Sequence, residues 1–240
     1  MAKVNLSVPK AVYFSVLADG KFHHSVEEGT VGAVKREYET SDGKKGFKWE
    51  ITGESIEGIL AGISVSDGDY GKQLHIAFAG GEAEDDKSVI VSLNLASNFA
   101  EDFLKKLPKI DLDKEIKLVP YSFEDDKGKK KRGITVYQGV DAEGKPVKLQ
   151  DHYHEMKKVG KKEQWAPLNG YPEIPKEATT WDSDDWKMYY TTARKFLVKE
   201  AEKHPLYNQT YLKAAQEQAR VDQEFKDNYP DSPNLKDIPF

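Results

Sequence analysis

Alternation of apolar and polar residues over the first two thirds of the chain constrains the fold more than any other feature. In the segment GFKWEIT, Phe47, Trp49 and Ile51 alternate with charged residues, and the segment KQLHIAF alternates in the same way. A period of two places successive side chains on opposite faces of a β-strand, so both segments are predicted strands. Residues 1–155 therefore predict a mainly β fold.

One short helical segment interrupts the predicted strands. Phe99, Phe103 and Leu107 recur at four-residue spacing, which indicates an amphipathic helix, and Pro108 ends it. Three predicted strands come directly before this helix and two follow it, with extra strands at both ends. A helix between the third and fourth strands of a five-stranded barrel is the plan of the OB-fold. We expect an OB-fold-like Greek-key barrel, while Greek-key sandwiches and other small barrels give a similar order.

The last third of the chain has a different character. Residues 160–183 hold three prolines in their first sixteen positions and show no period, so an irregular segment is expected. Asp182 and Ser183 stand in capping positions before a helical segment that stops ahead of Pro205, and a weaker apolar stripe follows. The expected parts are an OB-fold-like DNA-binding domain over 1–160, irregular chain and packing helices over 161–226, and a flexible tail over 227–240.

Composition narrows the class of protein. The 240 residues include no cysteine, which excludes disulfides, cysteine-based zinc sites and thiol catalysis. No apolar run approaches the roughly 18 residues of a transmembrane helix, and the first twenty residues lack an apolar signal-peptide core. We expect a protein of a reducing cytoplasm that does not enter a membrane.

Charge is distributed unevenly along the chain. The net charge is −5, but residues 127–162 hold 11 basic and 4 acidic residues. Distant negative charge is screened beyond a Debye length of about 10 Å, so this block can attract phosphates locally. A solvated lysine-rich loop is the alternative interpretation.

The chain ends in Asp237, Ile238, Pro239 and Phe240, an apolar group that has no core pattern around it. This ending resembles the C-terminal tip of bacterial-type single-stranded DNA-binding proteins, which combine an OB-fold with a tail that ends in aspartates followed by Ile-Pro-Phe. The resemblance covers the final residues and the general plan of strands. A bacteriophage-encoded protein with a diverged OB-fold fits it best.

The resemblance implies a function. Proteins of this family bind and protect single-stranded DNA without reading its sequence, and their tips recruit replication, recombination and repair enzymes. In such a tip, Phe240 would enter an apolar pocket of the partner and Pro239 would limit the backbone freedom lost on binding. We expect these partners, a location in the host cytoplasm and no cofactor, and we leave open whether the chain forms homo-oligomers.

Cations along the backbone and aromatic faces under the bases are the two means of binding unpaired strands. The connection DDKGKKKRG between the fourth and fifth predicted strands supplies the cations, and the flanking strands supply aromatic residues. Similar basic and aromatic groups occur near Trp49 and Tyr153. The expected DNA-binding residues are Lys44, Lys45, Lys48, Trp49, His75, Lys117, Tyr121, Phe123, Lys127, Lys129, Lys130, Lys131, Arg132, Tyr137, Tyr153, Lys157 and Lys158.

Several of these side chains have two interpretations. Trp49 lies on an apolar face, so burial in the core competes with a role in base stacking. Tyr121 and Phe123 fall on the outer face of their strand unless Pro120 marks a bulge that shifts the register. His75 is expected to point outward because it alternates with apolar neighbours.

The sequence gives no catalytic signal. His152, His154 and Glu155 are close together, but no third ligand has a recognisable spacing, so we predict no metal site. No phosphate-binding glycine loop, nucleophile elbow or isolated carboxylate pair is present, and a non-enzymatic protein is expected. Two other functions stay open: a protein–protein adaptor or phage assembly factor that uses the tip without binding DNA, and a nuclease, which the missing carboxylate–metal signature disfavours.

Overall fold

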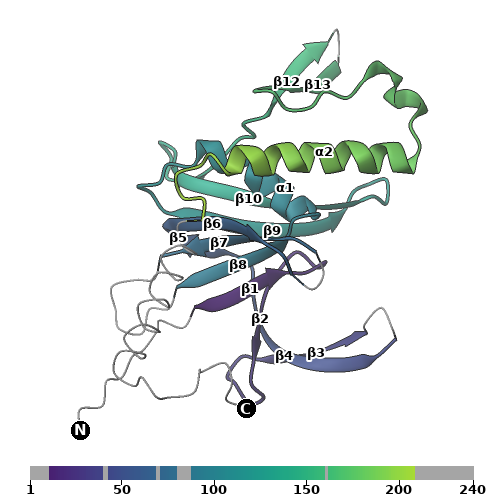
Figure 1. Ribbon diagram of the computed structural model, residues 1–240. Coiled ribbons are helices and arrows are strands. Elements are labelled where there is room, and N and C mark those ends of the chain that lie inside the picture. Colours follow the sequence, from purple (N-terminus) through teal and green to yellow (C-terminus); the bar gives the residue numbers. More distant parts are fainter. Residues whose placement is uncertain (1–10, 40–42, 69–70, 80–87, 160–161, 209–240) are drawn as a thin grey trace, which may run out of the picture.

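This computed structural model describes residues 11–39, 43–68, 71–79, 88–159 and 162–208 (Figure 1). Strands form most of the regular structure in this part of the chain, and the longer of its two α-helices comes last. The prediction of a mainly β protein with a C-terminal helix is confirmed. No helix within the described residues is both long and apolar enough to cross a membrane.

The largest sheet has seven strands in the order β3-β4-β2-β1-β8-β7-β6. Its strands are β1 (Val12–Val16), β2 (Phe22–Val26), β3 (Val34–Glu39), β4 (Lys45–Gly53), β6 (Leu60–Ser66), β7 (Gln73–Phe78) and β8 (Val89–Asn94). Neighbouring strands are antiparallel except β1 and β8, which run parallel. The outermost hairpin, β3–β4, extends away from the rest of the molecule (Figure 1).

A second sheet has four strands in the order β11-β10-β9-β5. They are β5 (Ile56–Gly58), β9 (Ile116–Glu124), β10 (Lys130–Val140) and β11 (Pro146–Lys148). Only Ile59 separates β5 from β6, so one nearly continuous stretch of chain contributes to both sheets. The two sheets share a core, to which β9 and β10 contribute Ile116, Leu118, Ile134 and Val136, all with no exposed surface.

The described strands do not close into the Greek-key barrel that the sequence predicts. In an OB-fold plan the third strand, here β8, would pair with the fifth, here β10. Instead β8 pairs with the N-terminal strand β1, and no ladder joins the two sheets within the described residues. Pairing between distant strands is the part of a fold that local alternation determines least.

Helix α1 (Asn98–Lys106) lies against β10, where two of its charged side chains bind the backbone of Ile134. Asp102 accepts a hydrogen bond from the Ile134 N–H at 3.2 Å, and Lys106 donates to the Ile134 carbonyl at 3.2 Å. Asp102 also accepts from the Tyr121 hydroxyl at 3.2 Å. Burial raises the pKa of Asp102 and lowers the pKa of Lys106. The N–H and carbonyl of Ile134 thus find hydrogen-bond partners on α1. In a longer sheet, a neighbouring strand would bind these two backbone groups.

The predicted short helix is present, and its α-helical part ends before Pro108. The Ser97 hydroxyl accepts a hydrogen bond from the Ala100 N–H at the start of the helix. Phe99 and Phe103 are buried, as their spacing predicts. At its end the helix tightens into the short 3₁₀ helix η1 (Leu107–Lys109), which contains Pro108.

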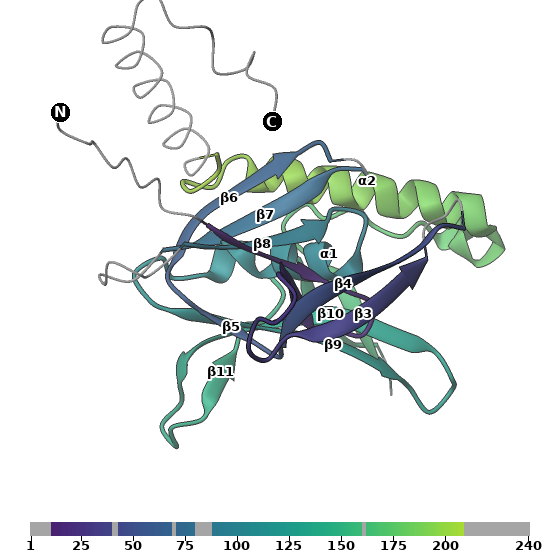
Figure 2. The ribbon, with the colours of Figure 1, turned by 90° about the horizontal axis from the view of Figure 1, so that it is seen from below.

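Helix α2 (Ser183–Ala201) begins at the predicted cap and packs on α1. Asp182 and Asp185 form a capping box, in which each side chain accepts a hydrogen bond from the other residue's backbone. The helix buries Ala193, Leu197 and Ala201. After it, Tyr207 bridges to Ile63 at the outer edge of β6. The helix therefore lies along one side of the core (Figures 1 and 2).

The segment expected to be irregular begins with a strand, which pairs with the residues just before it. Strands β12 (His154–Val159) and β13 (Lys162–Pro167) pair in register, and the short 3₁₀ helix η2 (Lys176–Thr180) follows. The prediction was wrong because charged residues and prolines obscure the alternation here. The two paired strands lie on either side of residue 160, where the sequence predicts the end of the first domain.

Candidate nucleic-acid interface

The turn between β9 and β10 is organised by Asp125. Its carboxylate accepts hydrogen bonds from the backbone N–H groups of Lys129 at 2.9 Å and Lys127 at 3.0 Å. These hydrogen bonds lower the pKa of Asp125, and the bond from the Lys129 N–H has the largest effect. Gly128 takes a left-handed conformation with φ of 72°, which a glycine adopts without strain. The turn therefore has a defined shape, and its lysine side chains are exposed to solvent.

The five cations of this connection differ in their surroundings. Lys127, Lys129 and Lys130 are exposed and have no ion-pair partner in the described part of the chain. The Lys131 ammonium lies 3.8 Å from Asp125, and Arg132 is half-buried with its Nε unpaired. The three unpaired lysines form the strongest local concentration of available positive charge on this hairpin; we call them the lysine tip.

Aromatic residues flank the lysine tip on β9. The predicted alternation is confirmed, since Ile116, Leu118 and Pro120 are buried and the register with β10 continues past Pro120 without a bulge. Phe123 is 56% exposed, and its ring centre lies 5.8 Å from that of Tyr121. Tyr121 is half-buried, and burial, together with the Asp102 carboxylate that accepts its hydroxyl, raises its pKa to about 12. Phe123 is therefore the ring available to a ligand.

Other predicted residues of β9 and β10 are less available. Lys117 forms an ion pair with Glu57 at 3.5 Å. Tyr137 is half-buried beside β11, its partner across the strands being Lys148. Neither side chain is placed as openly as Phe123.

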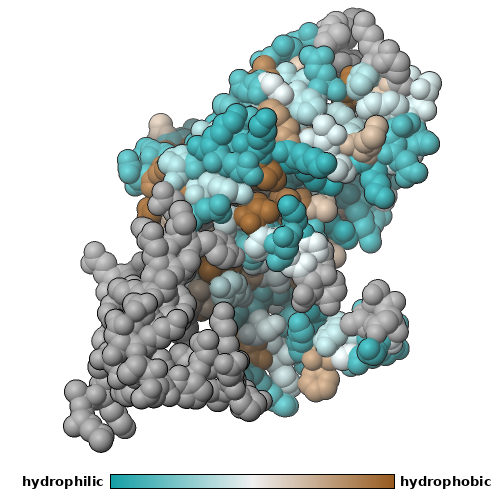
Figure 3. Space-filling model, viewed as in Figure 1, coloured by the Kyte–Doolittle hydropathy of each residue, from teal (hydrophilic) through white to brown (hydrophobic). Residues whose placement is uncertain are grey.

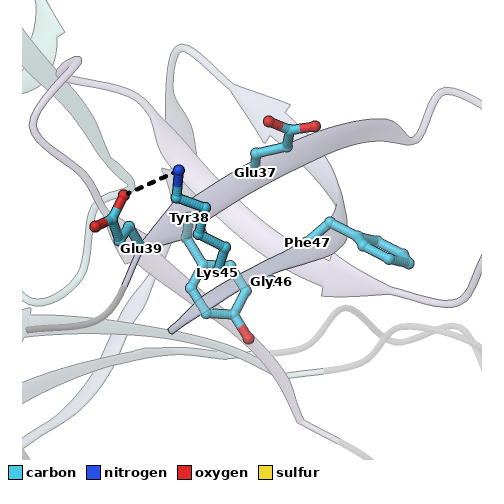
Figure 4. A pocket seen from close by; sticks show the side chains of 6 residues that line it. All are labelled: Glu37, Tyr38, Glu39, Lys45, Gly46 and Phe47. Atoms are coloured by element: carbon cyan, nitrogen blue, oxygen red, sulfur yellow. Dashed lines mark ion pairs between the residues drawn. The ribbon is translucent and has the colours of Figure 1, made fainter. Parts of the chain in front are cut away.

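The β3–β4 hairpin carries a second group of cations and rings (Figure 4). Lys45 pairs with Glu39 at 3.8 Å, while the Tyr38 ring packs against Gly46 on the opposite strand. Phe47 points away from this pair in Figure 4, and the Lys35 ammonium lies 4.0 Å from its ring centre. Lys48 lies 5.6 Å from the centre of the Tyr38 ring, and Lys44 is exposed. The hairpin thus combines positive charge with an open aromatic face.

The apolar face of β4 lies largely outside the core, which bears on the two interpretations of Trp49. Phe47 is exposed, Trp49 is half-buried with an unpaired indole N–H, and the buried residue is Glu50, at 4% exposure. Its carboxylate accepts two hydrogen bonds from Arg36, at 2.6 and 2.8 Å, and lies 2.9 Å from His23 Nδ1. A carboxylate can be buried when it is paired in this way. The apolar face of β4 extends beyond the core, so Trp49 is only partly buried.

This network predicts acid sensitivity. Hydrogen bonding from Arg36 and then from His23 lowers the Glu50 pKa below its ordinary value of 4.5 against the opposing effect of burial. A depressed pKa stabilises the fold above the unfolded value and loses that contribution as pH falls through the folded value. We expect the urea midpoint to fall as pH drops below about 4.5, and to fall less in Glu50→Gln. At neutral pH Glu50→Gln should cost about 1–3 kcal/mol, whereas Glu39→Gln, at an exposed pair, should change little. If the urea midpoint of Glu50→Gln falls with pH as steeply as that of the wild type, Glu50 is not the source of the acid sensitivity.

His75 lies on the outer face of β7, as predicted, but its ring nitrogens are already bound. Nε2 lies 2.8 Å from the Ser66 hydroxyl, and Nδ1 lies 2.8 Å from the Ser92 hydroxyl. Burial lowers the pKa of His75, which favours the neutral ring. The side chain therefore connects three neighbouring strands and adds little positive charge to the surface.

Tyr153 was expected to bind DNA, and this expectation was wrong. The residue is 4% exposed and packs edge-on against Phe196 at 5.4 Å between ring centres. Burial raises its pKa to about 12. Its neighbours on β12, Lys157 and Lys158, are exposed, and Lys157 pairs with Glu155 at 2.7 Å. The β12–β13 hairpin lies at the opposite end of the molecule from β3–β4, so these lysines belong to a different surface (Figure 1).

Sequence reasoning missed a basic surface on α2. Lys195 and Lys199 are one turn apart on its exposed side, and neither has an ion-pair partner among the described residues. Tyr190 and Arg194 lie beside them, with the guanidinium 5.9 Å from the ring centre. The four-residue spacing of these cations was visible in the sequence, but the packed face of the helix was not.

The predicted tip, Asp237 to Phe240, lies outside the described residues. Among the residues that the structure describes, no group of three or more acidic, histidine or cysteine side chains could hold a metal. Within HYHE, the His154 ring instead lies 3.0 Å from Asp151.

Comparison with known proteins gives no match to a family model, to a curated protein or to a solved structure. The function therefore has to be inferred from the chemistry of these surfaces.

Proposed function

We propose that this protein binds single-stranded DNA without reading its sequence and protects it during replication and recombination. The observation that carries the proposal is the lysine tip: Lys127, Lys129 and Lys130 stand unpaired on a well-defined turn, within the same hairpin as the open ring of Phe123. Cations for phosphates and a ring for bases are what an unpaired strand requires of a protein.

The order of the strands supports an OB-type plan. The stretch β5–β6 pairs with β9 in one sheet and with β7 in the other, as the shared first strand of an OB-fold would. Helix α1 then comes between the third and fourth strands, β8 and β9. On this plan the β9–β10 turn is the connection between the fourth and fifth strands, one of the two loops with which OB-folds usually bind nucleic acid.

A second hairpin is placed to take part. The β3–β4 and β9–β10 hairpins both extend toward the right-hand side in Figures 1 and 2. The β1–β2 turn packs against β9 between them, because a β-carbon added at Gly20 would overlap the backbone of Tyr121 and Ser122. We propose that a strand passes along this side, with Phe47 and Trp49 offering further ring contacts to its bases and Lys35 to its phosphates.

Binding of oligo-dT, followed by tryptophan fluorescence, tests the proposal. Trp49 is partly exposed on β4, which lies along the proposed path, so saturable quenching by oligo-dT is expected at low salt. A duplex of equal length should bind more weakly because its bases are stacked on each other and cannot contact the rings. Equal affinity for duplex and single strand would contradict the proposal, because it would mean that the surface binds any polyanion.

Phe123→Ala is expected to weaken oligo-dT binding by roughly 5- to 150-fold, which corresponds to the loss of about 1–3 kcal/mol for one stacked base. Trp165→Ala is the matched control, since Trp165 is 60% exposed but lies on β13, away from the proposed path. Anisotropy titrations of labelled oligo-dT measure both. If both substitutions change the affinity equally, Phe123 does not contact the bound strand.

One observation favours the alternative function, a protein–protein adaptor or assembly factor. Trp165, Ile174 and Met188 are all more than half exposed, on β13, before η2 and on α2 respectively. Exposed apolar side chains of this size are typical of protein contacts. Such a contact would depend weakly on salt, whereas lysine–phosphate binding weakens steeply between about 50 and 200 mM.

We propose in addition that Asp237 to Phe240 recruit replication, recombination and repair proteins. An aspartate beside Ile-Pro-Phe offers one charge and one ring to a partner with a basic rim and an apolar pocket. Removal of these residues should abolish partner capture while oligo-dT binding persists.

A further inference from the structure

A groove lies between α2 and the connections at the ends of β6, β7 and β8. It has a volume of about 540 Å³, within the range of small-ligand sites. Three parts of the chain form its walls: Gly71 and Lys72 before β7, residues 94–96 at the end of β8, and the exposed side of α2. The first two are tied by a hydrogen bond of 2.9 Å from the Leu95 N–H to the Lys72 carbonyl. We call this hollow the α2 groove.

The rim of the α2 groove is positively charged. Lys72, Lys195 and Lys199 are exposed on it, and none of them has an ion-pair partner in the described part of the chain. Arg194 also lines it; its Nε lies 3.4 Å from Glu101 without forming a hydrogen bond, so this pair leaves donors unused. Glu202 is the carboxylate among the described lining residues. The rim therefore has an excess of positive charge.

The floor of the α2 groove is apolar. Val65, Leu95, Val198 and Tyr207 line it and are only partly buried, which leaves apolar surface open to the hollow. Figure 3 shows hydrophobic side chains exposed below α2, bordered by hydrophilic ones. An apolar floor with a cationic rim suits a ligand that carries a flat ring next to a negative charge.

Aromatic rings continue the surface beyond the groove. On α2, Tyr190 is exposed and stacks on Trp186 with 5.9 Å between ring centres, one helical turn before Arg194. Along α2 the ring of Tyr190 is therefore followed by three cations, the guanidinium of Arg194 and the ammonium groups of Lys195 and Lys199. Exposed rings and cations on one helix supply both kinds of contact that an unpaired strand makes with a protein, stacking for its bases and charge for its phosphates.

We propose that the α2 groove is a second binding segment for the same single strand, with a base in the hollow and phosphates on Lys72, Lys195 and Lys199. This inference rests on the proposed function, because it extends the path that begins at the lysine tip. A strand that occupies both segments must be longer than one that occupies the lysine tip alone. Longer oligonucleotides therefore gain contacts that short ones cannot make.

The test compares Lys195→Ala/Lys199→Ala with the wild-type full chain on two lengths of oligo-dT, about 8 and about 30 nucleotides, since one OB-type module covers about 4–16. Alanine is compatible with a helix, so the double variant is expected to fold. The long oligonucleotide should bind roughly 10- to 25-fold more weakly at about 0.1 M salt, with a salt slope shallower by about 1.4. The short one should bind as before. Lys145→Ala/Lys148→Ala, with the same loss of charge near β11, should leave both affinities within about twofold.

The outcomes separate the two proposals. If the wild type binds neither oligonucleotide, the proposed function fails. If it binds both and the double variant loses nothing on the long one, or loses equally on both, the second segment is wrong. A double variant that keeps its affinity for the long oligonucleotide but no longer binds a synthetic peptide of residues 227–240 would assign the groove to an acidic peptide instead, which also overturns the inference.

Discussion

Replacing Lys127, Lys129 and Lys130 together by alanine is expected to lower the affinity for oligo-dT by roughly 100-fold at about 0.1 M salt. A lysine that neutralises one phosphate of a single strand contributes about 0.7 to the salt slope, which is about fivefold in affinity at this salt concentration. Three such contacts give the expected loss of affinity. The slope of log affinity against log salt concentration should become shallower by about 2. Anisotropy titrations at several salt concentrations measure both quantities.

The chain contains a matched control for this variant. In the β10–β11 turn, Asp141 accepts hydrogen bonds from the N–H groups of Glu143 and Lys145, both at 2.9 Å, as Asp125 does in the lysine-tip turn. Gly144 has φ of 78°, close to that of Gly128. Here, however, Lys145 is paired with Glu143 at 2.6 Å. Lys145→Ala should change affinity less than twofold, and a triple variant that folds and keeps wild-type affinity would remove the lysine tip from the site.

Asp102→Ala is expected to destabilise the fold by about 2–3 kcal/mol, since a buried donor left without its acceptor costs about 1–3 kcal/mol and Asp102 itself is half-buried. The change leaves the Tyr121 hydroxyl and the Ile134 N–H without their acceptor, and it leaves Lys106 without its counter-charge 4.0 Å away. The helix α1 would lose its polar attachment to β10, although its apolar contacts would stay. Urea unfolding at neutral pH measures the loss as a lower midpoint.

Two further substitutions serve as controls for Asp102→Ala. Asp102→Asn keeps an acceptor and removes the charge, so it should cost less than Asp102→Ala. Asp113→Ala removes an exposed carboxylate in the loop before β9 and should change stability by less than about 0.5 kcal/mol. If Asp102→Ala costs no more than Asp113→Ala, the contacts between α1 and Ile134 do not support the edge of β10.

Local pattern was sufficient where an element buries its own apolar face. Phe99 and Phe103 located α1, Asp182 located the start of α2, and the alternation of Ile116 with Leu118 gave the faces of β9. The lysine tip was visible because a turn that follows Asp125 and contains Gly128 can be recognised from residue types alone.

Local pattern failed where distant segments decide the surroundings of a side chain. Glu50 reads as a surface residue until Arg36 and His23 are brought to it from other strands. Tyr153 reads as a surface ring beside lysines, but Phe196 of α2 packs against it. The parallel pairing of β1 with β8 joins segments more than seventy residues apart, which no local alternation specifies. The α2 groove escaped prediction for the same reason.

The central claim is that an unpaired strand is bound through phosphate contacts at the lysine tip, and its salt dependence tests this most directly. Labelled oligo-dT titrated with the wild-type protein over a series of salt concentrations should give a logarithmic slope of about −2 or steeper, since each phosphate contact contributes about −0.7. Absence of saturable binding at the lowest salt, or an affinity that does not change with salt, would contradict the account.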